Sequence, residues 1–198
     1  WNELVDFLLA KKLIPLIDIA YQGFGKNLVD DVYGARLVVA KLPEAMIAVS
    51  CSKSFGLYRE RVGCALILSN SHNQTTAAHT HLMNIVRGIY SMPPSHGASI
   101  VAEILTTPEL KEQWQSELSL MRERIIITRS SLSANLSNKL GSDKFDFIAK
   151  QTGMFSFLGI TEEQVERLGN DYGIYMASNS RMNIGGLNEN NLEYLLAK

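Results

Sequence analysis

The residues best suited to chemistry are a lysine and an aspartate that each follow a run of strand-forming residues. Lys53 lies in a segment rich in small residues, 50–63, just after one such run. Asp18 ends an earlier apolar run, residues 13–18. Small and apolar neighbours, with the cation of Arg61 eight positions further on, favour the neutral form of a lysine amine. The neutral amine is the form that attacks a carbonyl carbon.

Lys53 and Asp18 together match the two protein groups that a pyridoxal phosphate site requires. The lysine would condense with the cofactor aldehyde, and the aspartate would protonate the pyridine nitrogen and make the ring an electron sink. Each residue also has an ordinary structural interpretation. A lysine in a loop is usually a solvated surface charge, and an aspartate after a strand is commonly a turn former or a helix cap. The residue types alone leave both interpretations open.

Further polar residues could complete such a site. The candidates near the lysine and the aspartate are Tyr21, Ser50, Ser52 and Arg61. The two serines and the guanidinium could form a phosphate cup, or they could be turn and surface residues, and the tyrosine could simply pack. Arg87 precedes a double-proline break, and Arg181 enters a predicted short strand. Guanidinium groups bind carboxylates in a bidentate manner, although a surface salt bridge is the ordinary role for each.

Composition excludes several other classes of function. The chain has 198 residues, 20% of them charged, and a net charge of −1, which gives no electrostatic reason to expect nucleic acid or an anionic membrane as a partner. Its two cysteines, Cys51 and Cys64, indicate free thiols in a reducing cytosol. No apolar stretch is long enough to span a bilayer. The four histidines lack the spacing of a zinc site, so no metal is expected.

The pattern of apolar residues predicts alternating helices and strands in the first half of the chain. Helices are expected near residues 4–9 and 30–41, and buried strands at residues 13–18, 47–50 and 64–68. This order predicts an α/β layer. Ligands bind at the carboxyl ends of the strands in such layers, and that is where Asp18 and Lys53 fall.

The second half of the chain is predicted to begin with a long helix, which starts at Thr107, Pro108 and Glu109. Its apolar face continues to Leu136 and leads into a second domain. Beyond it we expect short strands at residues 145–148, 154–157 and 174–176, a capping box at residues 161–164, and a final helix near Asn188.

The whole chain resembles the C-terminal half of an aspartate or aromatic-amino-acid aminotransferase, a fold-type-I pyridoxal phosphate enzyme. The resemblance rests on five segments that follow the family's order and spacing: residues 18–24, 50–63, 91–94, 153–157 and 181–183. It implies that residues 1–118 form part of a cofactor-binding large domain, with a mostly parallel sheet and flanking helices. Residues 119–198 would form a small α+β domain.

The resemblance also assigns roles at the cofactor. Lys53 would form the internal aldimine and then move a proton between the substrate α-carbon and cofactor C4′. Asp18 would pair with the pyridine nitrogen, and Tyr21 would hydrogen-bond the phenolic oxygen. The phosphate would be held by Ser50, Ser52 and Arg61.

The substrate contacts implied by the resemblance come from both domains and from a dimer. Arg181 would bind the α-carboxylate, and Phe155 would line the substrate pocket. Arg87 would reach across a homodimer interface to a distal carboxylate, with Ser91 on the neighbour's phosphate. Met92 departs from the asparagine that family members commonly carry. The implied reaction is transamination between an amino acid and a 2-oxo acid in the cytosol.

The family's N-terminal half would supply an aromatic ring that stacks on the cofactor and part of the phosphate cup. The chain alone is therefore expected to be inactive. A lyase or decarboxylase of the same fold would share the chemistry of Asp18 and Lys53, but a clamp such as Arg87 suits aspartate or glutamate.

Overall fold

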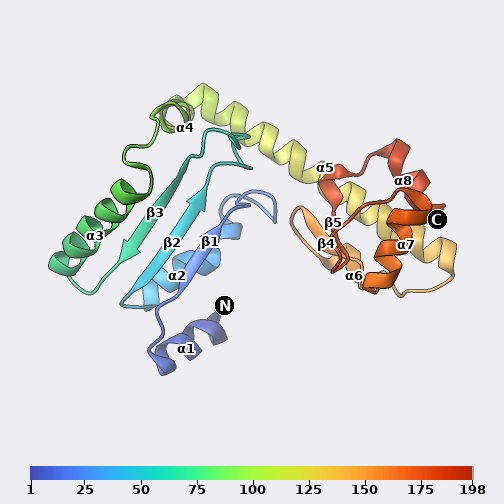
Figure 1. Ribbon diagram of the computed structural model, residues 1–198, viewed down its shortest axis with the longest axis horizontal. Coiled ribbons are helices and arrows are strands. Elements are labelled where there is room, and N and C mark those ends of the chain that lie inside the picture. The colour runs from blue at the N-terminus through green and yellow to red at the C-terminus, as the bar shows by residue number, and fades with distance from the viewer. Residues whose placement is uncertain (198) are drawn as a thin grey trace. The chain divides into compact units, whose positions relative to one another are not determined.

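The computed structural model describes residues 1–197, which divide into two compact units (Figure 1). The first unit contains Trp1–Gly23 and Asn27–Glu117. The second contains Phe24–Lys26 and the chain from Leu118 onward.

The first unit is built on a three-stranded sheet in the order β1, β2, β3. These strands are β1 (Leu16–Ile19), β2 (Ala45–Ser50) and β3 (Gly63–Leu68). β1 and β2 are parallel, whereas β2 and β3 are antiparallel. Residues 51–62 contain no helix that could carry the chain back across the sheet, so β3 runs opposite to β2. The expectation of a mostly parallel sheet therefore holds for only one of these two strand pairs.

Two helices cover one face of this sheet. They lie where the pattern of apolar residues predicted helices, near residues 4–9 and 30–41. They are α1 (Asn2–Lys11) and α2 (Tyr33–Lys41), the latter preceded by a 3-10 turn, η1 (Asp30–Val32). Val5 of α1 and Val38 of α2 are fully buried and pack with Leu42 and Ala45. Ile17 of β1 packs against this cluster, so the residues next to it in β1 point to the other face.

The strands are less buried than their apolar sequences predicted. Leu16 at the start of β1 is 67% exposed, and Leu66 in β3 is 47% exposed. Both strands lie at edges of the sheet, and only one face of it is covered by α1 and α2. The prediction that β1 and β3 are buried strands is therefore wrong for residues 1–197.

Three helices follow β3. They are α3 (His72–Tyr90), α4 (His96–Thr106) and α5 (Pro108–Leu140). The Ser71 side chain accepts a hydrogen bond from the Gln74 backbone and caps α3. α5 has the length that the sequence predicted, but the Thr107 hydroxyl donates to Glu103 at 3.1 Å instead of capping it. The Thr107 carbonyl accepts from Lys111 at 3.0 Å, which starts the helix through its backbone.

The second unit has a small antiparallel ladder, β4 (Phe155–Phe157) with β5 (Arg181–Asn183), packed with helices. The helices besides α5 are α6 (Phe147–Lys150), α7 (Glu162–Tyr172) and α8 (Glu189–Leu196), with a 3-10 turn η2 (Ile184–Gly186) after β5. The capping box predicted for α7 is confirmed, since Thr161 and Gln164 each bond the other's backbone. α8 begins after Asn188, as expected, and has a capping box of its own.

Two predicted strands of the second unit are wrong. Residues 145–146 form a turn and residues 147–148 begin α6, because Ile148 donates to the Phe145 carbonyl at 3.1 Å and buries its side chain completely. Residues 174–176 are irregular and pair with no strand, and Tyr175 is 85% exposed. In both places, hydrogen bonds to nearby backbone replaced the ladder that the apolar residues suggested.

Within residues 1–197, no helix combines the length and apolar character needed to cross a membrane. The same residues contain no group of three histidine, cysteine or acidic side chains placed to hold a metal ion.

Candidate active site

The parallel pair β1 and β2 brings the predicted chemical residues to one edge of the sheet. Asp18 lies opposite Ala48, and Ile19 lies opposite Val49, so both strands end at the same edge. Tyr21 and Lys53 follow these ends. The Lys53 Nζ atom lies 4.6 Å from the centroid of the Tyr21 ring. The structure therefore places these two predicted residues side by side.

Asp18 faces away from the helices that cover the sheet. Its neighbours Ile17 and Ile19 are partly buried, whereas Asp18 is exposed on the alternate side of the strand. Among residues 1–197, its carboxylate takes part in no hydrogen bond or ion pair. The carboxylate is therefore accessible on the face of the sheet that α1 and α2 do not cover.

The turn that carries Lys53 is closed by its own backbone. Phe55 donates to the Cys51 carbonyl, and Gly56 to the Lys53 carbonyl, each at 3.2 Å. The Ser52 N–H donates to the Ser50 hydroxyl at 3.2 Å. Ser52 and Ser54 are buried on either side of Lys53, which is itself half-buried. These contacts fix where the lysine leaves the backbone.

Trp114 of α5 anchors this turn and was missed by the sequence reasoning, which placed it only on an apolar helix face. Its indole N–H donates to the Ser54 carbonyl at 2.7 Å. Its ring stacks on Phe55 with centroids 4.4 Å apart and planes 9° apart. The available signal was the indole N–H itself, because a partly buried tryptophan usually needs a hydrogen-bond acceptor.

We expect Trp114→Phe to lower the free energy of unfolding by about 1 kcal/mol, because the ring contact remains while the hydrogen bond to Ser54 is lost. Trp114→Ala should cost about 1 kcal/mol more through loss of the aromatic pair. Urea denaturation measures both values, with the exposed Gln115→Ala on the same helix as the control. Equal stabilities for wild type and Trp114→Ala would show that the turn does not depend on this anchor.

Cys51 is the thiol closest in sequence to the lysine. Burial raises the pKa of the Cys51 thiol, and the nearby Cys64 raises it further. Both cysteines are free. A raised pKa favours the protonated thiol, which is a poor nucleophile.

Arg61 lies just before β3, next to the end of the β2–β3 ladder. The Cys51 N–H donates to the Val62 carbonyl at 3.1 Å, which holds this end of the ladder together. Arg61 has a left-handed backbone with φ of 52°, and its guanidinium donates to the Tyr58 carbonyl at 3.0 Å. No hydrogen bond in the described residues joins it to Ser50 or Ser52. Ser50 pairs with Gly63 at this end of the ladder, so Ser50, Ser52 and Arg61 belong to neighbouring segments. Their role as a phosphate cup stays a prediction.

Arg87 and Ser91 lie at the end of α3. The Ser91 N–H donates to the Arg87 carbonyl at 3.1 Å, and Ser91 has a φ of 63°. Arg87 is exposed and forms no ion pair among residues 1–197. No hydrogen bond or ring contact in that part of the chain connects either residue to Lys53. A role across a dimer interface, as the resemblance implies, does not require such a contact.

The second unit brings together the other two predicted substrate residues. Arg181 pairs with Phe157 across the β4–β5 ladder, and Phe155 pairs with Asn183, so these side chains share one face. The Arg181 guanidinium carbon lies 4.8 Å from the centroid of the Phe155 ring. Arg181 is exposed, and within residues 1–197 its side chain forms no ion pair. A carboxylate can therefore approach it.

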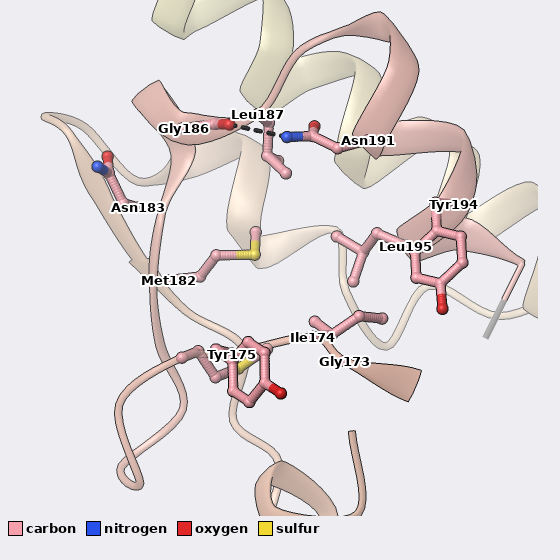
Figure 2. Close-up of a pocket in the computed structure, with 11 residues that line it drawn as sticks. Gly173, Ile174, Tyr175, Met182, Asn183, Gly186, Leu187, Asn191, Tyr194 and Leu195 are labelled. Carbon is pink, nitrogen blue, oxygen red and sulfur yellow. Dashed lines mark hydrogen bonds between the residues drawn. The ribbon is translucent and has the colours of Figure 1, made fainter. Parts of the chain in front are cut away.

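A cavity of about 330 Å³ lies elsewhere in the second unit and contains neither of these residues (Figure 2). Figure 2 shows Met182, Leu187 and Leu195 around it, with Asn191 bonded to the Gly186 carbonyl at 3.0 Å. Met182 alternates with Arg181 along β5, so it points away from the face that carries the guanidinium. The cavity is lined mainly by apolar side chains and has none of the candidate chemical groups.

Comparison with known proteins identifies the family of the chain. The family model "Aminotransferase class I and II" matches residues 1–198. The chain therefore belongs to this aminotransferase family.

Members of the family align with nearly all of the chain. An aromatic-amino-acid aminotransferase of Paracoccus denitrificans is 46% identical over 195 residues, covering 98% of the chain and 50% of that protein. An aspartate aminotransferase of Pseudomonas aeruginosa is 40% identical over 193 residues, covering 98% and 48%. The chain thus spans about half the length of the curated relatives it matches.

A solved aminotransferase has the same fold over the whole chain. The aromatic-amino-acid aminotransferase of Burkholderia pseudomallei, covalently bound to pyridoxal phosphate, matches with a TM-score of 0.95 and 40% identity. The match covers 100% of this chain and 50% of that one. The mixed helix and sheet architecture described above is thus that of half an aminotransferase.

Proposed function

We propose that the full-length protein containing this chain catalyses pyridoxal-phosphate-dependent transamination. The substrates would be an amino acid, aspartate or an aromatic one, and a 2-oxo acid such as 2-oxoglutarate. The observation that carries the proposal is the contact between Lys53 and Tyr21 at the carboxyl edge of β1 and β2, with the unpartnered Asp18 carboxylate on the same strand end. The aminotransferase names of the relatives support the same reaction.

The residues at this edge fit pyridoxal phosphate by their chemistry. Lys53 supplies the amine that would hold the cofactor covalently, and Asp18 the carboxylate that would bond its pyridine nitrogen. Tyr21 would bond the phenolic oxygen. Ser50, Ser52 and Arg61 are the hydroxyl and guanidinium donors for its phosphate. When bound, the cofactor supplies an aldehyde for the amino group and a ring that accepts an electron pair from the substrate α-carbon.

The chain's own residues would then perform binding and proton transfer. Arg181 binds the α-carboxylate, which all amino acids share, and Phe155 borders the bound side chain. The Lys53 amine acts as the base that removes the proton from the substrate α-carbon. Its fixed turn keeps that amine within a small volume, which lowers the entropy lost on reaching the reactive geometry.

The distal carboxylate of a dicarboxylic substrate would be bound by Arg87 from the partner of a homodimer, and Ser91 would contact the partner's phosphate group. The exposure of Arg87 and its lack of an ion pair in the described residues support this assignment. We also propose that residues 1–118 belong to the large domain and residues 119–198 to the small domain, and that the protein works in the cytosol.

A direct assay tests the proposed function. The full-length protein should show a visible absorbance band from bound cofactor and should transaminate aspartate or phenylalanine with 2-oxoglutarate. Residues 1–198 alone should show no measurable turnover, because the family's other half contributes to the cofactor site. A full-length protein with neither the band nor turnover after addition of pyridoxal phosphate would contradict the proposal.

A further inference from the structure

Arg129 of α5 is the only charged residue among residues 1–197 that is buried, with 2% of its surface exposed. It forms no ion pair in that part of the chain. Burial lowers the pKa of the Arg129 guanidinium, which means that the surroundings do not favour its charge. Burying a cation without a carboxylate partner costs free energy, so the hydrogen bonds of Arg129 must have a role that an apolar side chain could not fill.

All the hydrogen bonds of this guanidinium go to the segment around β4. Its Nη1 donates to the Ser156 hydroxyl, and its Nη2 donates to the carbonyls of Gly153 and Phe155, the latter at 3.3 Å. Ser156 is 1% exposed, so this connection lies inside the second unit. A planar fork of donors fixes several acceptors at once, and here it fixes the backbone of β4.

A second arginine of α5 does the same for the segment after β5. Arg124 donates to the Gly185 carbonyl at 2.7 Å and to the Leu187 carbonyl at 3.1 Å. Both acceptors follow Arg181 in the chain: Gly185 lies in η2, and Leu187 is the residue after that turn. α5 therefore holds β4 and the segment that follows β5, and Arg129 is the residue that contacts β4.

The alternation of side chains in β4 relates Arg129 to the substrate residues. Ser156 points inward to the guanidinium of Arg129, so Phe155 points to the opposite side. On that side its ring lies under Arg181, at 4.8 Å from the guanidinium carbon. The carbonyl that Arg129 binds and the ring that Arg181 covers thus belong to the same residue.

We infer that Arg129 is a positioning residue for substrate: by fixing the backbone of Phe155 it sets the orientation of Arg181 toward the α-carboxylate. This role rests on the proposed function of Arg181. A shift of the order of 1 Å in a binding group far from the chemistry is enough to reduce catalysis strongly. In this assignment Arg129 acts through Phe155, not by touching the substrate or the cofactor.

The test is a double-mutant cycle in the full-length protein. Arg129→Lys keeps the charge but not the fork of donors, and should weaken binding of the substrate-like acid 3-phenylpropionate about tenfold in calorimetry. KM for the amino acid should rise while the visible absorbance of the cofactor stays unchanged. In a Phe155→Leu background, the effect of Arg129→Lys should fall below about twofold, because the ring that transmits it is gone.

The outcomes separate the possible explanations. An equal tenfold effect of Arg129→Lys in both backgrounds, or no effect in either, would overturn the positioning role. If Arg129→Lys does not fold, Ser156→Ala takes its place, since it removes one acceptor of the guanidinium. It should weaken binding of 3-phenylpropionate about threefold when Phe155 is present and leave it unchanged in the Phe155→Leu protein. If Arg181→Ala binds 3-phenylpropionate as the wild type does, the assignment of Arg181 fails, and the positioning role fails with it.

Discussion

Lys53→Ala in the full-length protein should reduce transamination by several orders of magnitude. The substitution removes both the amine that would attach the cofactor and the base that would take the α-proton, so two different steps of catalysis are impaired. The protein should still bind pyridoxal phosphate non-covalently, because Asp18, Tyr21 and the phosphate donors remain. Steady-state kinetics with aspartate and 2-oxoglutarate measures the first effect, and dialysis of the loaded protein measures the second.

Lys41→Ala is the matched control, since Lys41 is an exposed lysine in the last turn of α2 in the same unit. It should retain wild-type turnover and wild-type absorbance. Near-normal transamination by Lys53→Ala would refute the assignment of Lys53, whatever the cofactor does in that variant.

Arg87→Ala should reduce kcat/KM for aspartate far more than for phenylalanine. Loss of a bidentate charged pair in a partly desolvated site costs roughly 3–5 kcal/mol, or about two to four decades in kcat/KM. Phenylalanine has no distal carboxylate and should lose little. Arg181→Ala should impair both amino acids by similar factors, because both present an α-carboxylate.

Arg36→Ala provides the comparison, because Arg36 is exposed on α2 and has no assigned role. Kinetics with the two amino donors under the same conditions give all the required ratios. Equal losses for aspartate and phenylalanine in Arg87→Ala would contradict the clamp, and selective loss of aspartate in Arg181→Ala would exchange the two roles.

Local signals in the sequence predicted the starts of α7 and α8. The capping box of Thr161 with Gln164 is complete within four residues and was predicted correctly. The final helix was predicted to start near Asn188, and α8 begins there. Strands were harder to predict, because the partner of a strand lies far away in sequence. The apolar residues at 174–176 pair with no strand. Ile148, within the predicted strand 145–148, lies instead in α6, where its side chain is fully buried.

The candidate site, too, was predicted only in part from the sequence. Asp18 and Lys53 were predicted because each lies near the end of a run of strand-forming residues, and the parallel register of β1 with β2 brings those strand ends together. Trp114 and Arg129 were missed because each donates to backbone carbonyls, of Ser54 and of Gly153 and Phe155, which carry no signal in the side-chain sequence. The apolar pattern also could not predict that β3 runs antiparallel to β2, since parallel and antiparallel strands can have equally apolar sequences.

The attachment point of the cofactor is the most direct test of the account. The full-length protein would be loaded with pyridoxal phosphate, treated with sodium borohydride to make any carbon–nitrogen double bond permanent, digested, and examined by peptide mass spectrometry. The account predicts that the added phosphopyridoxyl mass is on the peptide containing Lys53 and on no other lysine. An active protein that carries the label on another lysine, such as Lys26 or Lys150, or carries no label at all, would contradict it.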